Sequence, residues 1–203
     1  MQTIKLAKNV SLKQAGETPG AIFQVEDGHL KLMRHLPDGR SLLILLYSTG
    51  NTFGETAVIT GRPMYDHTTV ALVPCRVRRL AVTDFWELYE RHREISDALC
   101  RKFARLVALQ FDRQDLKATL RLGSRIAAMF ANLAEQLGSS DQNGGVTFTL
   151  PISHTDIAAH VEATRQAVQR EIAALTAAGL VRRRDDRWSV PNLNLLRSRF
   201  NEV

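Results

Sequence analysis

The sequence predicts an α+β protein with an N-terminal β domain, a long helix and a C-terminal winged helix-turn-helix. Short strand patterns separated by turn residues fill the first eighty positions, and helical periodicity without Pro or Gly follows from Thr83 to about Leu122. Two further short helical patterns, joined by three residues, precede a polar hairpin pattern. We expect domain boundaries that divide the chain into 1–90, 91–122 and 123–203.

The composition is that of a globular protein with a mildly basic balance. Of 203 residues, 44% are hydrophobic and 24% charged, and the net charge of +6 favours nucleic acid as a partner, with an anionic membrane second. Cys75 and Cys100 are too few and too far apart for a disulfide framework or a zinc site, so both are expected as reduced thiols. No segment approaches the roughly 20 apolar residues that span a bilayer, and no signal peptide is recognisable. We therefore expect a cytoplasmic protein.

Strand patterns and turn residues organise the N-terminal domain. Strands are expected at 21–25, 29–34, 41–47, 68–73 and 75–82. Pro37-Asp38-Gly39 predicts a hairpin turn between the second and third of these strands. Short strands at regular spacing indicate a barrel, a roll or a sandwich.

The central helical segment carries a narrow apolar stripe. Thr83 is expected to cap a short helix, and Leu122-Gly123-Ser124 is expected to end the longer helix that follows, before another helix over 125–137. The stripe recurs at spacings of three, four and seven and consists of Ile95, Leu99, Leu106, Leu109, Leu116 and Leu120. Such a stripe either packs a helix on its own sheet or pairs it with a second copy. Because the stripe lasts more than three heptads, we favour a self-pairing dimer helix.

Residues 152–190 carry the most informative pattern. Ser153 followed by Asp156 predicts a capping box for one short helix, 161–163 form a turn, and Thr164 can cap a second helix. The second helix is apolar on one side and polar at its start, where its polar residues are Arg165, Gln166, Gln169 and Arg170. Groove insertion requires this division, since Arg suits guanine and Gln suits adenine. An amphipathic surface helix with solvated charges is the alternative, but caps, turn length and hairpin together favour binding of double-stranded DNA.

The same segments resemble the CRP/FNR superfamily, the cyclic AMP receptor protein and its relatives. The resemblance covers about residues 15–195 and is carried by Gly28–Gly39 with Gly50–Glu55, by Gly123–Ala127 and by Ile152–Leu180. It implies a β-roll of the cyclic-nucleotide-binding jelly-roll kind, a long dimerisation helix and a homodimer that regulates transcription from a palindromic site. It also implies an activator role, with RNA polymerase as a partner that the polar loop 139–145 can touch.

Carried over residue by residue, the resemblance makes Arg165 and Arg170 readers of guanine and phosphate, and gives Thr164 and Ser153 phosphate contacts. Gln166 stands where cyclic AMP receptor proteins usually have glutamate. Glutamate accepts from cytosine, whereas glutamine suits adenine. We therefore expect a DNA half-site that differs from the usual one at that base pair.

The sensor region departs from the family pattern. Gly54 and Glu55 match the start of the phosphate-binding cassette, but Tyr65-Asp66 falls where nucleotide binders carry Arg-Ser. Asp66 would repel a cyclic phosphate, and Gln110-Phe111 replaces the small hydroxyl residues that contact adenine. Glu55 is then expected as a structural cap. The resemblance thus implies an effector other than cyclic AMP in its usual mode, or none; the alternative is a cyclic-nucleotide-responsive regulator with a rearranged pocket.

Other functions find little support in the residues. An N-terminal cysteine cluster for iron–sulfur ligation is lacking, and possible haem ligands are expected to be surface or packed residues: His29, His35, His67 and Cys75. No cupin His-x-His pair, Ser-His-Asp signature or P-loop occurs, so no enzyme, metal or cofactor is expected. A nucleotide-binding module that works through protein contacts alone is disfavoured by the helix-turn-helix.

Overall fold

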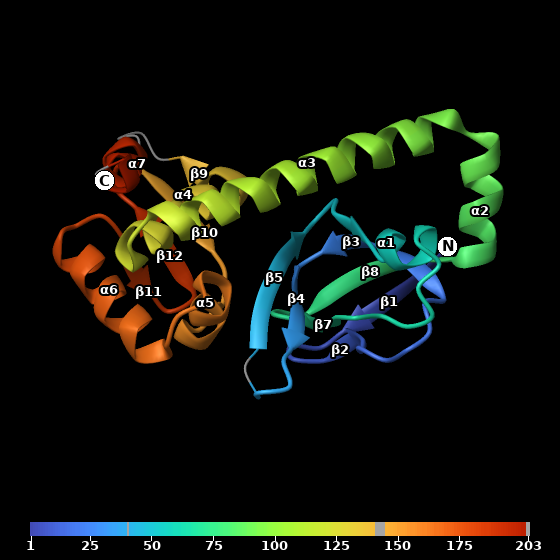
Figure 1. Cartoon of the computed structure of the whole chain (residues 1–203), viewed down its shortest axis with the longest axis horizontal. Helices are drawn as coiled ribbons and strands as arrows, with labels where there is room; N and C mark the ends of the chain where they lie inside the picture. The colour runs from blue at the N-terminus through green and yellow to red at the C-terminus, as the bar shows by residue number, and fades with distance from the viewer. Residues whose placement is uncertain (40, 141–144, 202–203) are drawn as a thin grey trace. The chain divides into compact units, whose positions relative to one another are not determined.

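The computed structural model describes residues 1–39, 41–140 and 145–201 and contains two compact units, Met1–Leu109 and Gln110–Val203 (Figure 1). The division falls inside one helix, α3 (Arg93–Thr119). The boundaries expected from the sequence, after residues 90 and 122, stay a prediction. Among the described residues, no helix combines the length and the apolar character needed to cross a membrane.

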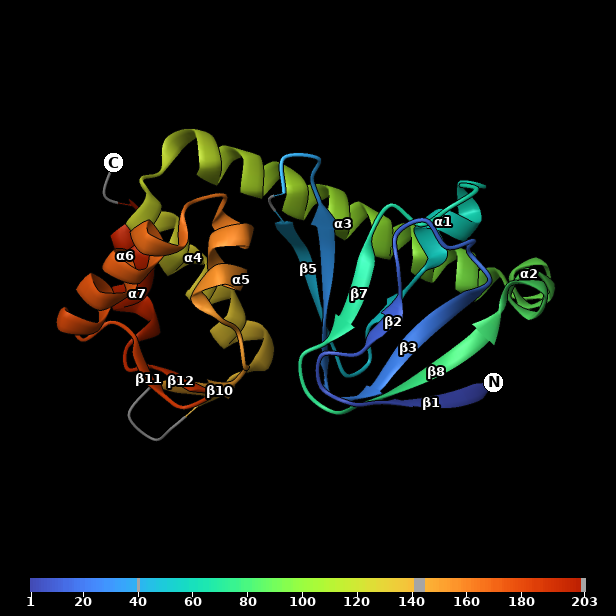
Figure 2. The same cartoon turned by 90° about the horizontal axis from the view of Figure 1, so that it is seen from below.

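The first unit is built on two four-stranded antiparallel sheets (Figure 2). One has the order β1 (Gln2–Leu6), β8 (Cys75–Ala81), β3 (Ala21–Asp27), β6 (Thr52–Phe53). The other has the order β2 (Ser11–Lys13), β7 (Thr68–Ala71), β4 (His29–His35), β5 (Ser41–Ser48). A single buried cluster takes side chains from both sheets, including Phe23, Leu30 and Val77. This shared core makes the unit a β-roll and confirms the predicted fold class.

All five strands expected from the sequence are present, with small shifts at their ends. The predicted hairpin also forms, since β4 and β5 pair from His29↔Ser48 to His35↔Ser41. Gly39 turns the chain with φ of 82°, a conformation that glycine adopts without strain. The sequence did not reveal β6 or the short helix α1 (Glu55–Ile59), because both are too brief to show periodicity.

Two helix boundaries expected from the sequence are wrong. Helix α2 (Val82–Arg91) begins before Thr83, and Ala81 stands at its N-cap without a side-chain hydrogen bond. The break after α3 comes at Leu120–Arg121, so Gly123 lies in the first turn of α4 (Leu122–Leu137). The carboxylate of Glu171 lies against Gly123, where an added Cβ would stand 2.7 Å from Oε2. A carboxylate at a helix N-terminus is favourable, which helps α4 to start at a glycine-containing turn.

The second unit packs helices on a sheet of order β11 (Arg182–Arg184), β12 (Arg187–Val190), β10 (Val146–Thr149), β9 (Ser139–Ser140). Its further helices are α5 (His154–Val161), α6 (Arg165–Ala177) and α7 (Leu193–Asn201). Phe130 and Trp188, whose ring centroids are 4.7 Å apart, are both fully buried at the centre. Of the polar loop predicted at 138–145, residues 141–144 lie outside the described residues.

Helix α7 was not predicted. Its signal is short: the side-chain oxygen of Asn192 accepts from the backbone N–H of Leu195 at 2.9 Å, which is a helix cap, and Leu196 is buried. Nine residues after a proline give too few apolar positions to establish a helical period.

Candidate nucleic-acid interface

Helix α5 begins at the capping box that the sequence predicts. The hydroxyl of Ser153 accepts from the backbone N–H of Asp156 at 3.1 Å, and the carboxylate of Asp156 accepts from the backbone N–H of Ser153 at 3.0 Å. The Ser153 hydroxyl also donates to Asp156 Oδ2 at 2.7 Å. Its proton is therefore committed to the cap, which leaves little for the phosphate contact expected of Ser153.

The turn between α5 and α6 is held by a left-handed residue and an ion pair. Glu162 has φ of 52°, and its backbone N–H donates to the carbonyl of Ala158. Its carboxylate pairs with Lys117 in the last turns of α3. Thr164 then caps α6, because its hydroxyl oxygen accepts from the backbone N–H of Ala167 at 3.2 Å. Unlike the hydroxyl proton of Ser153, that of Thr164 has no acceptor among the described contacts. It can therefore be donated to a ligand.

Helix α6 presents two chemically distinct faces. Val168, Ile172 and Leu175 are buried against the unit's core. The four polar residues predicted to read DNA are all exposed at the start of the helix: Arg165, Gln166, Gln169 and Arg170. Within the described part of the chain, neither arginine has an ion-pair partner. The fold therefore brings together the predicted DNA-contacting residues and leaves their donors free for a ligand.

The hairpin formed by β11 and β12 lies beyond α6 and carries a dense positive charge. Arg183 pairs across the hairpin with Trp188, and the chain turns at Asp185, which has φ of 56°. The Arg183 guanidinium also donates through Nε to the carbonyl of Asp185 at 2.7 Å. Four arginines are exposed on this hairpin: Arg182, Arg183, Arg184 and Arg187. The sequence indicated the hairpin, but these arginines were not among its predicted site residues.

Most acidic groups of the helix-turn-helix are engaged internally. Asp156 is buried in its capping box, Glu162 pairs with Lys117, and Glu171 lies at the start of α4. On the outer face the exposed arginines of α6 and the hairpin outnumber the exposed Asp185 and Asp186, so the net charge there is positive. Burial lowers the pKa of the His154 imidazole, and the nearby Arg183 and Arg165 lower it further. Cations gathered in this way attract the phosphates of a polyanion.

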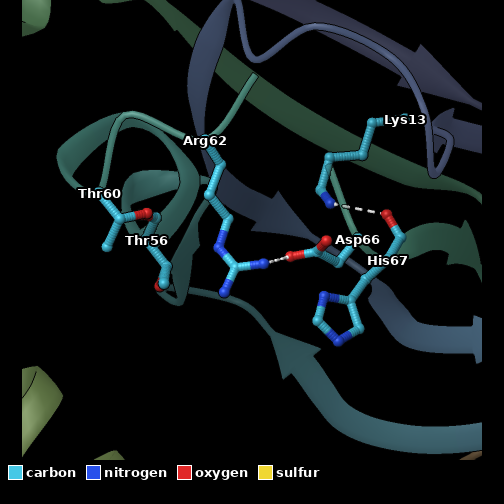
Figure 3. A network of polar contacts seen from close by, with 6 residues as sticks. All are labelled: Lys13, Thr56, Thr60, Arg62, Asp66 and His67. Carbon is cyan, nitrogen blue, oxygen red and sulfur yellow. Dashed lines mark hydrogen bonds and ion pairs between the residues drawn. The ribbon is translucent and has the colours of Figure 1, made fainter. Parts of the chain in front are cut away.

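The polar effector-pocket residues predicted in the roll have partners within the chain, and Figure 3 shows this for Asp66. Tyr65 is buried, and its hydroxyl donates to the carbonyl of Ala21 at 3.2 Å. Asp66 forms an ion pair with Arg62. Neither side chain presents a cation to a cyclic phosphate. Lys13, the cation beside them, donates to the carbonyl of His67 at 3.1 Å and lies 4.1 Å from the Tyr65 ring centroid.

Gly54 and Glu55 are built into the roll, but Glu55 is not the cap expected from the sequence, because Gly54 stands at the N-cap of α1 without a side-chain hydrogen bond. Gly54 has φ of 99°, and a Cβ there would lie 2.9 Å from the carbonyl oxygen of Ala21, so a larger residue does not fit. Glu55 begins α1 and is only 3% exposed. Its Oε1 accepts from the ammonium of Lys102 at 2.7 Å. This partner could not be predicted from the sequence, because Lys102 lies 47 positions later on a different element.

The apolar stripe predicted for self-pairing divides into two parts. Ile95 and Leu99 pack on the roll of their own chain, against Ile22, Val58 and Phe85, as in the alternative weighed from the sequence. The remaining positions are half-buried at Leu106, Leu116 and Leu120 and exposed at Leu109. Gln110 and Phe111, expected near an effector, are exposed on α3 in the second compact unit.

Two family models match most of the chain. Residues 3–92 match the cyclic nucleotide-binding domain, and residues 124–199 match the Crp-like helix-turn-helix domain. The transcriptional regulator LdrP of Thermus thermophilus is 27% identical over 177 residues, which cover 87% of this chain and 86% of the relative. A CRP-like cAMP-activated global transcriptional regulator of Mycobacterium tuberculosis is 26% identical over 185 residues, covering 90% of this chain and 80% of the relative.

Solved structures with the same fold cover nearly the whole chain. A CRP-family transcriptional regulator from Thermus thermophilus aligns with a TM-score of 0.80 and 24% identity over 98% of this chain and 97% of that one. FixK2 from Bradyrhizobium japonicum aligns with a TM-score of 0.84 and 18% identity, covering 97% and 96% of the two chains.

Proposed function

The chain belongs to the CRP/FNR superfamily of transcription regulators, and from that premise we propose that it binds a palindromic promoter site as a homodimer and activates transcription. The observation that carries the proposal is the outer face of α6. There Arg165, Gln166 and Arg170 are exposed beside a buried apolar face, and neither arginine has an ion-pair partner among the described residues. In helix-turn-helix proteins the second helix enters the major groove, and its N-terminal residues contact the base edges.

Base contacts and backbone contacts come from different parts of the unit. Arg165, Gln166, Gln169 and Arg170 face outward at the start of α6, where a recognition helix meets base edges. The Thr164 hydroxyl and the exposed arginines of the β11–β12 hairpin, Arg182, Arg183 and Arg184, supply phosphate contacts. Phosphate contacts fix the orientation of the protein on the duplex, and base contacts supply sequence preference.

We place the dimer contact on a different face of α3 from the stripe predicted by the sequence. Cys100, Ala104, Val107 and Phe111 follow at spacings of four, three and four, and all are exposed. Val107 is 52% exposed and Phe111 62% exposed, which is unusual for large apolar side chains on a helix. At 100° per residue the centre of this seam lies about 130° around the helix from that of Ile95 and Leu99, which the roll already covers.

Cyclic AMP in its usual mode does not fit the roll. A cyclic phosphate needs a cation, but Asp66 occupies the expected position and holds the nearby Arg62 in an ion pair. We therefore propose a regulator that uses another effector or none. A cyclic-nucleotide-responsive regulator with a rearranged pocket is the second candidate, because release of Arg62 from Asp66 would free a guanidinium. Calorimetric titration with cyclic AMP and cyclic GMP separates the two, since micromolar affinity would support only the second.

The experiment that tests the proposed function is selection of bound sequences from random DNA, followed by anisotropy titration of the selected duplex. We expect a two-fold palindrome with half-sites one helical turn apart. Arg165→Ala should abolish the preference and leave weak, salt-sensitive binding. Selection of no sequence would contradict the proposal.

Transcription in vitro with RNA polymerase, with the site placed upstream of a promoter, then tests activation. The same assignment makes the cytoplasm the expected location.

The proposed homodimer is tested separately, by sedimentation velocity. Val107→Asp and Phe111→Asp should convert a dimer into a monomer in sedimentation velocity, because a charge in a desolvated seam is costly. Leu195→Asp is the matched control. Leu195 is also a large apolar side chain exposed on a helix, at 54%, but it lies on α7. A dimer that persists in both seam variants would overturn the assigned face.

A further inference from the structure

The ammonium of Lys102 is held at the edge of the roll by three hydrogen bonds. It donates to Glu55 Oε1 at 2.7 Å, to the carbonyl oxygen of Thr52 at 2.5 Å and to the Thr52 hydroxyl at 2.9 Å. The carboxylate and the hydroxyl come from α1 and β6, whereas the ammonium comes from the first half of α3. All three N–H donors of the lysine therefore have acceptors in the roll.

Glu55 is the partner that makes this contact important. It is a nearly fully buried carboxylate, and the desolvation of such a charge must be offset by a cation or by hydrogen bonds. Tyr47 lies close enough for the Glu55 charge to add to the burial that raises the pKa of the Tyr47 phenol. The compensating charge comes from Lys102.

Lys102 also continues the face of α3 that packs on the roll. Ile95, Leu99 and Lys102 are spaced by four and three residues, so they lie on one side of the helix. The first two make apolar contacts with the roll, and the third ends the contact with a buried ion pair. The geometry of α3 on the roll is thus fixed by residues of one chain.

We propose that Lys102 is a built-in substitute for a bound effector. Its ammonium pairs with the carboxylate of Glu55 and holds α3 against the roll. The chain itself thus supplies the link that a small ligand would otherwise make. The consequence rests on the proposed function. Because α3 also carries the seam around Val107 and Phe111, a helix held by Lys102 presents that seam without an effector. The protein then binds DNA in its ligand-free form, and any effector of the roll must displace Lys102 from Glu55.

The test compares DNA affinity and amide hydrogen exchange of the full chain in the wild type, Lys102→Ala and Arg101→Ala. Arg101 is the matched control because it is an exposed neighbouring cation without an ion pair among the described residues. We expect Lys102→Ala to lose about tenfold or more in DNA affinity and to exchange faster over α3, and Arg101→Ala to stay within about twofold. Millimolar propylammonium replaces the deleted part of the lysine. At constant ionic strength it should restore most of the affinity of Lys102→Ala and leave the other two proteins unchanged.

A second variant keeps the proposal testable if Lys102→Ala does not fold. Lys102→Met with Glu55→Gln removes both charges and retains the size of both side chains, so no buried charge is left without a partner. It should fold and still lose DNA affinity. Affinity within about twofold of the wild type in this double variant, or in a folded Lys102→Ala, would overturn the proposal. Failure of the wild type to select any DNA would instead overturn the proposed function, while the exchange rates of α3 would still report on the ion pair.

Discussion

The guanidinium carbon of Arg183 lies 4.7 Å from the centroid of the Trp188 ring, on the hairpin that follows the recognition helix. Trp188 is fully buried, and its indole N–H donates to the carbonyl of Leu150 at 3.1 Å. A surface cation is thereby positioned by a core side chain. Nε of Arg183 donates to the carbonyl of Asp185, but stacking leaves the terminal Nη1 and Nη2 groups able to donate to a phosphate.

Replacement of Arg183 should weaken binding to all DNA sequences alike. We expect Arg183→Gln to reduce the slope of log affinity against log salt by about one, because one phosphate contact is lost. Anisotropy titrations over a range of salt concentrations measure this slope for the selected site and for a scrambled duplex. Arg105→Gln, an exposed cation on α3, is the control and should leave the slope unchanged. An unchanged slope in Arg183→Gln would remove Arg183 from the interface.

The two caps of the helix-turn-helix should respond differently to the same change. Ser153→Ala and Thr164→Ala should each lower the free energy of unfolding by about 1 kcal/mol, because each removes a helix cap. Only Thr164→Ala should also lower DNA affinity, since the Ser153 proton is already held by Asp156. Urea denaturation and DNA titration of folded variants measure the two effects. Thr164→Ser retains the hydroxyl and serves as the control; equal DNA affinity in both alanine variants would show that Thr164 only caps.

Gln166 should set a base preference of its own. Glutamine pairs best with adenine and glutamate with cytosine, and a good pair gives about 1–3 kcal/mol of discrimination. Sequence selection with the wild type and with Gln166→Glu should therefore return half-sites that differ at one base pair. Recovery of the usual family half-site by the wild type would refute this expectation.

DNA affinity should rise as the pH falls through the ordinary range of histidine. Burial, Arg183 and Arg165 hold the pKa of His154 below its usual 6.5 in the free protein. A DNA phosphate beside the imidazole favours its charged form, so the pKa is higher in the complex and binding takes up a proton. Titrations between about pH 5.5 and 7.5 should show tighter binding at the acidic end. His154→Gln should flatten this dependence; an equal slope in the variant would assign it to another group.

Lys13 should lower the free energy of unfolding of the protein at neutral pH. Burial lowers its pKa from 10.5 to about 8, although Glu17 and Asp66 partly oppose this. Between these values the unfolded chain holds more protons than the folded one, so stability rises as the pH rises through that window, and the full cost is borne below it. Allowing for partial hydration, Lys13→Met should raise the free energy of unfolding at pH 7 by about 1–2 kcal/mol. Denaturation at pH 7 and 10 should show that advantage shrinking; a constant difference would mean that Lys13 titrates normally.

Local signals explain why the helix-turn-helix could be predicted closely. A capping box joins Ser153 to Asp156, and Thr164 caps α6 by accepting from the N–H of Ala167. Each of these motifs spans only four consecutive residues. The hairpin turn at Gly39 is equally local. The start of α4 could not be placed in this way. Gly123 ordinarily interrupts a helix, but the Glu171 carboxylate from α6 lies against it, and that neighbour is set by packing.

The sequence by itself determined the longer strands and helices and the exposed polar face of α6, because these depend on hydrogen bonds and periodicities between near neighbours. The tertiary structure alone decided which side of α3 the roll covers, and it paired Lys102 with Glu55 and Arg62 with Asp66. A stripe of leucines looks the same whether it meets its own sheet or a second copy. A buried carboxylate finds its cation through the fold, since desolvation makes the nearest available charge its partner, however far away that charge lies in the chain.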